Sequence, residues 1–163
     1  MLPKQYNTPI RSARGLRSSP HRDFTESEIA HLKAEINAIN ADESRFVFET
    51  GRSTAYYDKA DVVYVSPNVF PDLLSGTTHP RDLMSERAAL AHEYYGHRTY
   101  RNTDLEIGSW NDEFRASYTA AKTAPNLSDA DRRYLVLDAI ERAKEAGVAI
   151  KYNAFMKGVV YGY

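Results

Sequence analysis

The residues best suited to chemistry lie together in the segment HEYYGH, residues 92–97. Neutral imidazoles bind divalent transition metals, and a carboxylate beside them can accept a proton from water. Whether both histidines can hold one ion depends on their spacing. On a regular α-helix, residues four apart are offset by about 40° around the axis, whereas residues five apart are offset by about 140°. His92 and His97 are five apart and therefore face different surroundings unless the helix widens locally.

A π-type turn, which closes residue i onto residue i+5, would return both histidines to one face. Gly96 lies inside that turn, where a residue without a Cβ atom best tolerates irregular backbone. The sequence therefore predicts a π-bulge over residues 92–97. A straight α-helix would instead leave two unrelated histidines with no shared metal.

Composition restricts the ligands that a metal could have. The chain of 163 residues contains no cysteine, which excludes disulfides, thiolate ligands and cysteine nucleophiles. Any metal must be held by His, Asp, Glu or neutral oxygen ligands. With 42% hydrophobic and 26% charged residues, the composition is that of one globular domain.

A second motif follows the histidines: residues 112–116 read DEFRA. Together, HExxGH and this DExRA segment resemble the two motifs of the dipeptidyl peptidase III family, which are zincin metallopeptidases with a one-residue insertion in the active-site helix. In that family an E-E-x-R-A motif supplies the third zinc ligand. The resemblance is confined to residues 92–117. Asp112 stands where the family has Glu, and Ser117 stands where the family continues with an acid.

The resemblance implies a zinc metallopeptidase domain that holds Zn²⁺ through His92, His97 and Glu113, with an open position for water. Glu93 is then expected to act as general base toward that water. The outer carboxylate that orients a ligand histidine is expected to be Asp112 or Asp104. We expect Arg115 to pair with a carboxylate near the site. Four candidates remain for the donor that stabilises the transition-state oxyanion: Tyr94, Tyr100, Tyr118 and His79.

In its small size, the chain also resembles the metallopeptidase toxin domains at the carboxyl ends of bacterial polymorphic toxins. This implies an effector that cleaves a peptide or protein substrate, with an immunity or inhibitor protein as partner. Three alternatives stay open: a metal-binding interaction module without catalysis, a non-haem iron site, since two His and a carboxylate also suit iron, and a nucleic-acid-binding protein.

The nucleic-acid alternative depends on the start of the chain. Residues 1–22 hold five basic side chains and no acid, whereas residues 23–163 hold sixteen bases and twenty-two acids. Such an arm could bind nucleic acid or an anionic membrane, or act as a transit peptide. Because no aromatic platform accompanies the bases, we expect a flexible leader or linker, followed by the metallopeptidase domain over residues 23–163.

The chain shows no sign of a membrane or secretory segment. No run of eighteen apolar residues occurs, and the first residues lack an apolar core. We therefore expect no membrane span and no signal peptide, and a protein that is either cytoplasmic or delivered as part of a larger secreted protein.

The elements around the motifs predict an α+β, small zincin-like domain in which a short antiparallel sheet precedes a helical half. Thr25 begins a capping box for a helix over residues 26–39. Short strands are expected near residues 46–48, 55–57 and 61–65, with the first two paired as a hairpin. The strand at 62–65 is expected to be the sheet edge and to bind an extended peptide.

The helical half follows from local capping signals. Asp82 is expected to cap a helix over residues 83–101 that carries the histidines. Ser109 is expected to cap the next helix, which stops before Pro125, and Ser128 to cap a third that ends at Gly147. The remaining tail is expected to form a strand or an extended segment.

Overall fold

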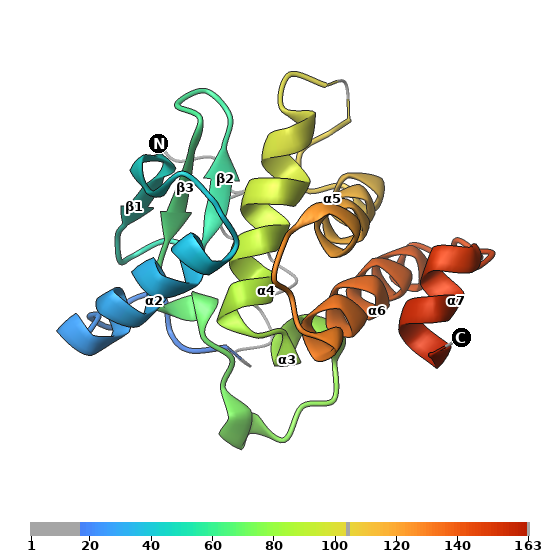
Figure 1. Ribbon diagram of the computed structural model, residues 1–163, viewed down its shortest axis with the longest axis horizontal. Helices are drawn as coiled ribbons and strands as arrows, with labels where there is room; N and C mark the ends of the chain where they lie inside the picture. The colour runs from blue at the N-terminus through green and yellow to red at the C-terminus, as the bar shows by residue number, and fades with distance from the viewer. Residues whose placement is uncertain (1–16, 104, 163) are drawn as a thin grey trace.

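The computed structural model describes residues 17–103 and 105–162. A small sheet and helix α2 lie on one side of the molecule, α5, α6 and α7 lie on the other, and α4 runs between them (Figure 1). The architecture is α+β, as predicted. The helices named above span the following residues: α2 Glu26–Ala38, α4 Glu86–Ala91, α5 Trp110–Thr123, α6 Asp129–Glu145 and α7 Ala154–Tyr161.

The sheet is mixed, which corrects the prediction of an antiparallel sheet. Its strands are β1 (Phe46–Phe48), β2 (Ala55–Tyr57) and β3 (Val62–Val65), in the order β1-β3-β2. β1 is parallel to β3, so the predicted hairpin between the first two strands is wrong, and β2 with β3 forms the antiparallel pair. The prediction that residues 62–65 form the edge is also wrong.

The position of β3 follows from burial. Val63 and Val65 are fully buried, whereas every residue of β2 is only partly buried, so the most buried strand occupies the centre. The connection from β1 to β2 is held by long-range contacts: Gly51 donates its N–H to the carbonyl of Pro20, and Thr54 donates its N–H to the Asn68 side chain. Such contacts leave no local sequence signal.

The predicted capping residues at three helices are confirmed. Thr25 and Glu28 form the capping box of α2, Ser109 caps α5, and Ser128 caps α6. Gly147 has a φ of +76° just beyond α6, as expected for a residue that ends a helix.

The predicted helix over residues 83–101 is interrupted. It consists of α3 (Pro80–Leu83), α4, a π-helix η5 (His92–His97) and a 3₁₀ turn η6 (Arg98–Tyr100). Met84 separates α3 from α4 because its ψ of 131° is extended. His79 caps α3 and Ser85 caps α4, so Asp82 is not the cap; it lies inside α3 and is fully buried.

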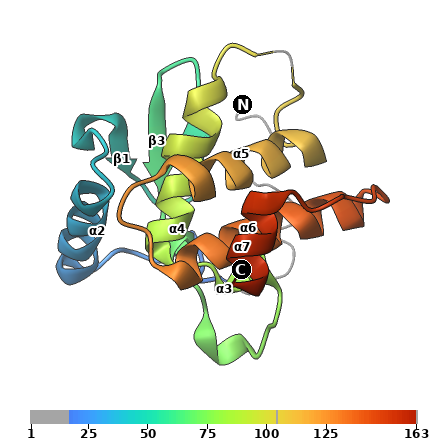
Figure 2. The same ribbon diagram turned by 45° about the vertical axis from the view of Figure 1, so that its right-hand side comes forward.

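The tail forms α7 rather than the expected strand. Asn153 caps this helix by accepting from the N–H of Met156, and Met156 and Val160 bury one face at helical spacing. Figure 2 shows α7 beside α6, on the outer side of the helical half. Among the helices of the described ranges, none has the length and hydropathy needed to cross a membrane.

The described end of the expected leader packs against the domain. Arg17 is only 6% exposed and inserts its guanidinium among backbone carbonyls, and Arg22 pairs with Glu28 at 2.8 Å. The acceptors of Arg17 are the carbonyls of Asn68, Val69, Arg81, Asp82 and Met84. Residues 17–22 therefore belong to the packed body, while residues 1–16 of the expected leader lie outside the described residues.

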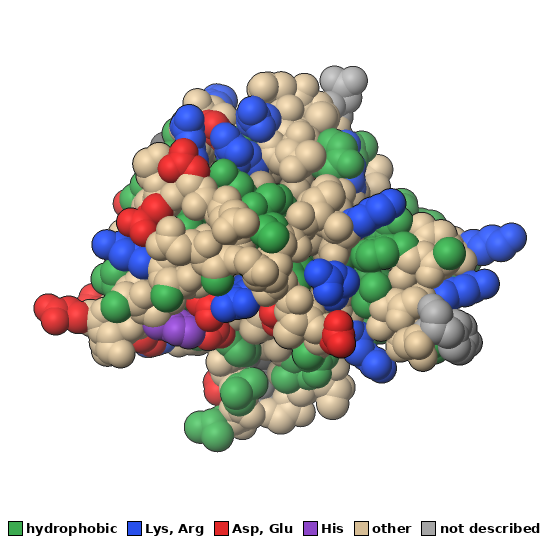
Figure 3. All heavy atoms as spheres, viewed as in Figure 1, with side chains coloured by type: hydrophobic (Ala, Val, Ile, Leu, Met, Phe, Trp, Pro, Cys, Tyr) green, Lys and Arg blue, Asp and Glu red, His purple; other side chains and the backbone are tan. Residues whose placement is uncertain are grey.

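One loop projects from this body. Between β3 and α3, the chain exposes Leu73 and Leu74, which are 72% and 96% accessible. Figure 3 shows hydrophobic side chains at the lower tip of the molecule, where this loop lies in Figure 1. The loop lies outside the pocket of the candidate site.

Candidate metal centre

The predicted π-bulge is present over residues 92–97. Its glycine lets two helices approach closely, because a Cβ atom on Gly96 would lie 2.7 Å from the carbonyl carbon and 2.8 Å from the Cα atom of Ala116 in α5. No larger residue fits there without moving α5. The close approach of α5 therefore depends on Gly96.

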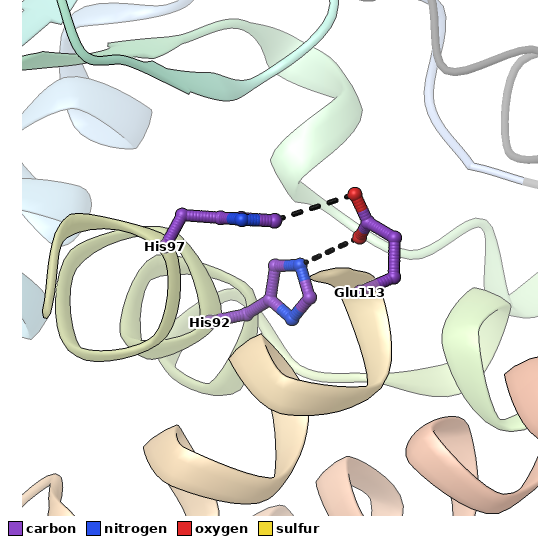
Figure 4. A group of neighbouring side chains, drawn as sticks. All are labelled: His92, His97 and Glu113. Carbon is purple, nitrogen blue, oxygen red and sulfur yellow. Dashed lines mark hydrogen bonds and ion pairs between the residues drawn. The ribbon is translucent and has the colours of Figure 1, made fainter. Parts of the chain in front are cut away.

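The bulge brings both histidines to one carboxylate (Figure 4). His92 Nε2 lies 3.1 Å from Glu113 Oε1, and His97 Nε2 lies 3.3 Å from Glu113 Oε2. One potential ligand atom from each residue lies within 4.8 Å of the others. The two predicted motifs therefore meet, with each oxygen of Glu113 facing a different imidazole.

This donor set fits a divalent metal ion. Two imidazole nitrogens and a carboxylate are ligands that Zn²⁺ and several other transition metals accept. His92 and Glu113 are buried, and His97 and Glu113 line a pocket that opens to the surface, so one side of the cluster is accessible. The structure supports a possible metal site without specifying the metal.

The charges within the cluster are strongly coupled. Burial alone would raise the pKa of Glu113, but His97 and Arg142 hold that pKa well below its ordinary value. Burial alone would lower the pKa of His97, but Glu113 and a hydrogen bond to Asp112 raise it well above its ordinary value. The cluster thus favours a cationic group beside the Glu113 carboxylate.

Asp112 lies where an outer carboxylate is needed. Its Oδ1 is 3.5 Å from His97 Nδ1, and its Oδ2 accepts from the N–H of Gly108 at 3.0 Å. Arg115 Nη2 lies 3.8 Å from Asp112 Oδ1 and donates to Thr103, so it is next to the carboxylate rather than to the ligands. The alternative outer carboxylate, Asp104, lies outside the described residues.

Glu93 lines the same pocket and is 5% exposed. Its Oε1 accepts from the backbone N–H of Tyr56 in β2 at 2.9 Å, and its Oε2 lies 3.8 Å from His92 Nε2. The edge strand therefore anchors one oxygen of Glu93 and leaves the other facing the ligands.

Of the four predicted oxyanion donors, only Tyr100 lines the pocket. Tyr94 stacks on Phe46, and its hydroxyl accepts from the N–H of Asp42. The other two face elsewhere: the Tyr118 hydroxyl accepts from Asn153, and His79 caps α3 and contacts Glu145.

Helix α6 contributes residues that the motif comparison did not find. Arg142 lines the pocket, and its Nη2 lies 3.4 Å from Glu113 Oε1. Asp138 is fully buried behind the site and accepts from Arg142 Nε at 3.2 Å. A sequence signal existed, because these two charges, four residues apart, interrupt the apolar face of a predicted helix that also carries Leu135 and Ala139.

A second group, His79, Glu141 and Glu145, also places potential ligand atoms within 4.8 Å of one another. Both of its carboxylates already have cationic partners. Arg81 lies 2.7 Å from Glu145, and Lys144 lies 3.2 Å from Glu141. This group is therefore explained as a surface ion-pair cluster.

Comparisons of the chain with protein-family models, with curated proteins and with solved structures found no match. The functional inference therefore depends on the geometry of the site itself.

Proposed function

We propose that this protein is a zinc-dependent hydrolase of peptide bonds. The observation that carries the proposal is the π-helix, which turns His92 and His97 toward one buried carboxylate, Glu113, beside a pocket that contains Glu93. Three protein ligands with one accessible side are the arrangement of catalytic zinc sites, whereas structural sites surround the metal with four protein ligands.

The protein residues divide into ligands and proton carriers. His92, His97 and Glu113 would hold the ion, which when bound supplies Lewis acidity that polarises a scissile carbonyl and acidifies a water molecule. Glu93 would take the proton of the attacking water on Oε2 and pass it to the leaving nitrogen. The N–H of Tyr56 holds Oε1, so the carboxylate keeps one orientation during both transfers.

The walls of the pocket favour an extended chain as substrate. Residues 54–56, which lead into and form part of the edge strand β2, line one side, and Leu105 and Ile107 line another with apolar side chains. An extended peptide in this pocket would lie beside β2 and the ligands. Tyr100 and Arg142 line the same pocket and are the candidates to stabilise a developing oxyanion.

The test combines metal analysis with the substitution Glu93→Gln. The purified protein is expected to contain one zinc per chain and to cleave members of a mixed peptide library, as detected by mass spectrometry. Glu93→Gln should retain the zinc and lose cleavage by at least about 100-fold, because general-base catalysis contributes on that scale. The control is Glu86→Gln, which lies on α4 and pairs with His31 outside the pocket.

The possible results separate the alternatives. Zinc in both proteins without cleavage by either would favour a metal-binding interaction module. Full cleavage by Glu93→Gln would refute the assigned base. Stoichiometric iron in place of zinc would favour the iron-site alternative.

A further inference from the structure

Behind the candidate metal centre, a buried chain of side chains connects His92 to helix α6. His92 Nδ1 lies 2.8 Å from Ser117 Oγ, and Ser117 Oγ donates to Asp138 Oδ2 at 2.6 Å. His92 is 1% exposed, while Ser117 and Asp138 are inaccessible to solvent. Bulk water therefore cannot replace either contact.

The charges on Asp138 determine the direction of both hydrogen bonds. Arg142 Nε and Arg81 Nε lie 3.2 and 3.4 Å from Asp138 Oδ1, so two guanidinium groups keep this residue a carboxylate. A carboxylate only accepts hydrogen bonds, and a serine hydroxyl has one proton. Ser117 must give that proton to Asp138 and can only accept from His92. His92 Nδ1 therefore carries a proton, and Nε2 is the ring nitrogen that faces Glu113 and the cluster.

We propose that Ser117 and Asp138 are a positioning pair that fixes the tautomer and ring orientation of His92, so that Nε2 is the nitrogen available to a metal. This rests on the proposed function, because it requires that the centre holds a metal. Ligand histidines usually donate their second N–H directly to a carboxylate, a carbonyl or water. Here a serine hydroxyl connects the histidine to a carboxylate on the next helix.

The same carboxylate also reaches a second ligand. Asp138 Oδ1 holds Arg142, and Arg142 Nη2 lies 3.4 Å from Glu113 Oε1. Glu113 Oε1 in turn faces His92 Nε2 at 3.1 Å, which closes a ring of five side chains. Asp138 therefore restrains His92 through Oδ2 and Glu113 through Oδ1 and Arg142.

The test compares the zinc affinities of full-length variants by competition with a chelator. Ser117→Ala is expected to weaken zinc binding by about 10- to 100-fold, the usual effect of removing an outer partner of a ligand histidine. Ser117→Thr retains a hydroxyl and should restore most of the affinity. The matched control is Ser66→Ala, because Ser66 is equally buried and its hydroxyl donates to Asn68, which is not part of the metal cluster.

A spectroscopic measurement excludes a merely structural role. In ¹⁵N NMR spectra of the zinc-free proteins, Nδ1 of His92 should be protonated in the parent and in Ser117→Thr. In zinc-free Ser117→Ala, Nδ1 should be protonated only in part, because the hydroxyl that accepts its proton is gone. A zinc-free parent in which Nδ1 of His92 carries no proton would overturn the proposal.

Two failures can be told apart. If the parent binds zinc and Ser117→Ala binds it as tightly, the positioning pair is refuted and the metal site stands. If the parent binds no zinc, the proposed function is refuted, and the positioning pair with it.

Discussion

At the scale of single residues, Glu113 is the residue that contacts both histidines of the site. Each of its oxygens faces one imidazole, and Arg142 approaches the oxygen that also faces His92. Glu93 and Asp112 add two more carboxylates around the two histidines. The three carboxylates give the cluster more negative than positive charge. A divalent ion would neutralise that excess.

The residues that the sequence could identify are those with motif spacing. His92, His97 and Glu113 follow from HExxGH and DExRA, and the structure brings them together. The path from His92 through Ser117 to Asp138 matches no motif, because it depends on how α6 packs against α5. The sequence shows only that Asp138 and Arg142 interrupt the apolar face of a helix. The four oxyanion candidates could not be ranked from the sequence for the same reason: side-chain direction is decided by tertiary packing.

Asp61, at the turn between β2 and β3, gives a prediction about pH. A hydrogen bond from Arg98, together with one from Tyr56, outweighs partial burial and lowers the pKa of Asp61 to about 2. The pKa of an unfolded aspartate is about 3.9. The folded value is the lower one, so Asp61 stabilises the protein above pH ~4, and this contribution is lost as the pH falls toward 2.

We therefore expect Asp61→Asn to reduce the free energy of unfolding near neutral pH and to flatten its dependence on pH between 2 and 4. Asn also accepts the positive φ of 52° at this position, so backbone strain does not confuse the comparison. Urea unfolding at a series of pH values measures both effects. Identical pH profiles for the two proteins would contradict the assigned ion pair.

At the scale of elements, the capping signals succeeded at three helices and failed at Asp82, and the predicted strand pairing was wrong. Thr25, Ser109 and Ser128 mark helix starts because each cap bonds to a backbone N–H three residues ahead. The order of the strands depends on contacts such as Gly51 with Pro20, which no local pattern encodes. The π-helix could be predicted because two histidines five residues apart can share one metal only if the helix widens. On a regular α-helix they would diverge.

The π-helix also gives a prediction for Gly96→Ala. The added Cβ atom would meet the backbone of Ala116, which cannot move without displacing α5 and Glu113. Overpacking of this kind costs about 1–3 kcal/mol, and the displaced ligand should also weaken zinc binding. Thermal unfolding and zinc competition measure the two effects. Unchanged affinity for zinc would show that the close approach of α5 does not position Glu113.

At the scale of the whole molecule, Arg17 joins the N-terminal segment to the loops and α3 that precede the site. Its guanidinium donates to carbonyls on both sides of the projecting loop, including Asn68 and Met84. Removing it takes this donor from several carbonyls in a buried region, and a buried acceptor that loses its donor costs on the order of 1–3 kcal/mol. The charge pattern of residues 1–22 gave no indication of this role, because burial of one arginine depends on carbonyls more than fifty residues away.

Arg17→Ala is therefore expected to lower the free energy of unfolding by at least about 2 kcal/mol, as measured by urea denaturation. Arg133→Ala provides the control, since Arg133 is exposed on α6. Equal stabilities of the two variants would indicate that residues 17–22 are a dispensable leader after all.

The central claim is that His92, His97 and Glu113 together hold one metal ion. Anomalous diffraction at the zinc edge, from crystals of the protein purified with zinc, tests it most directly. The predicted result is one strong peak at about 2.0–2.2 Å from both histidine Nε2 atoms and from an oxygen of Glu113. A peak only at the surface cluster of His79, Glu141 and Glu145, or no peak at the π-helix, would contradict the claim.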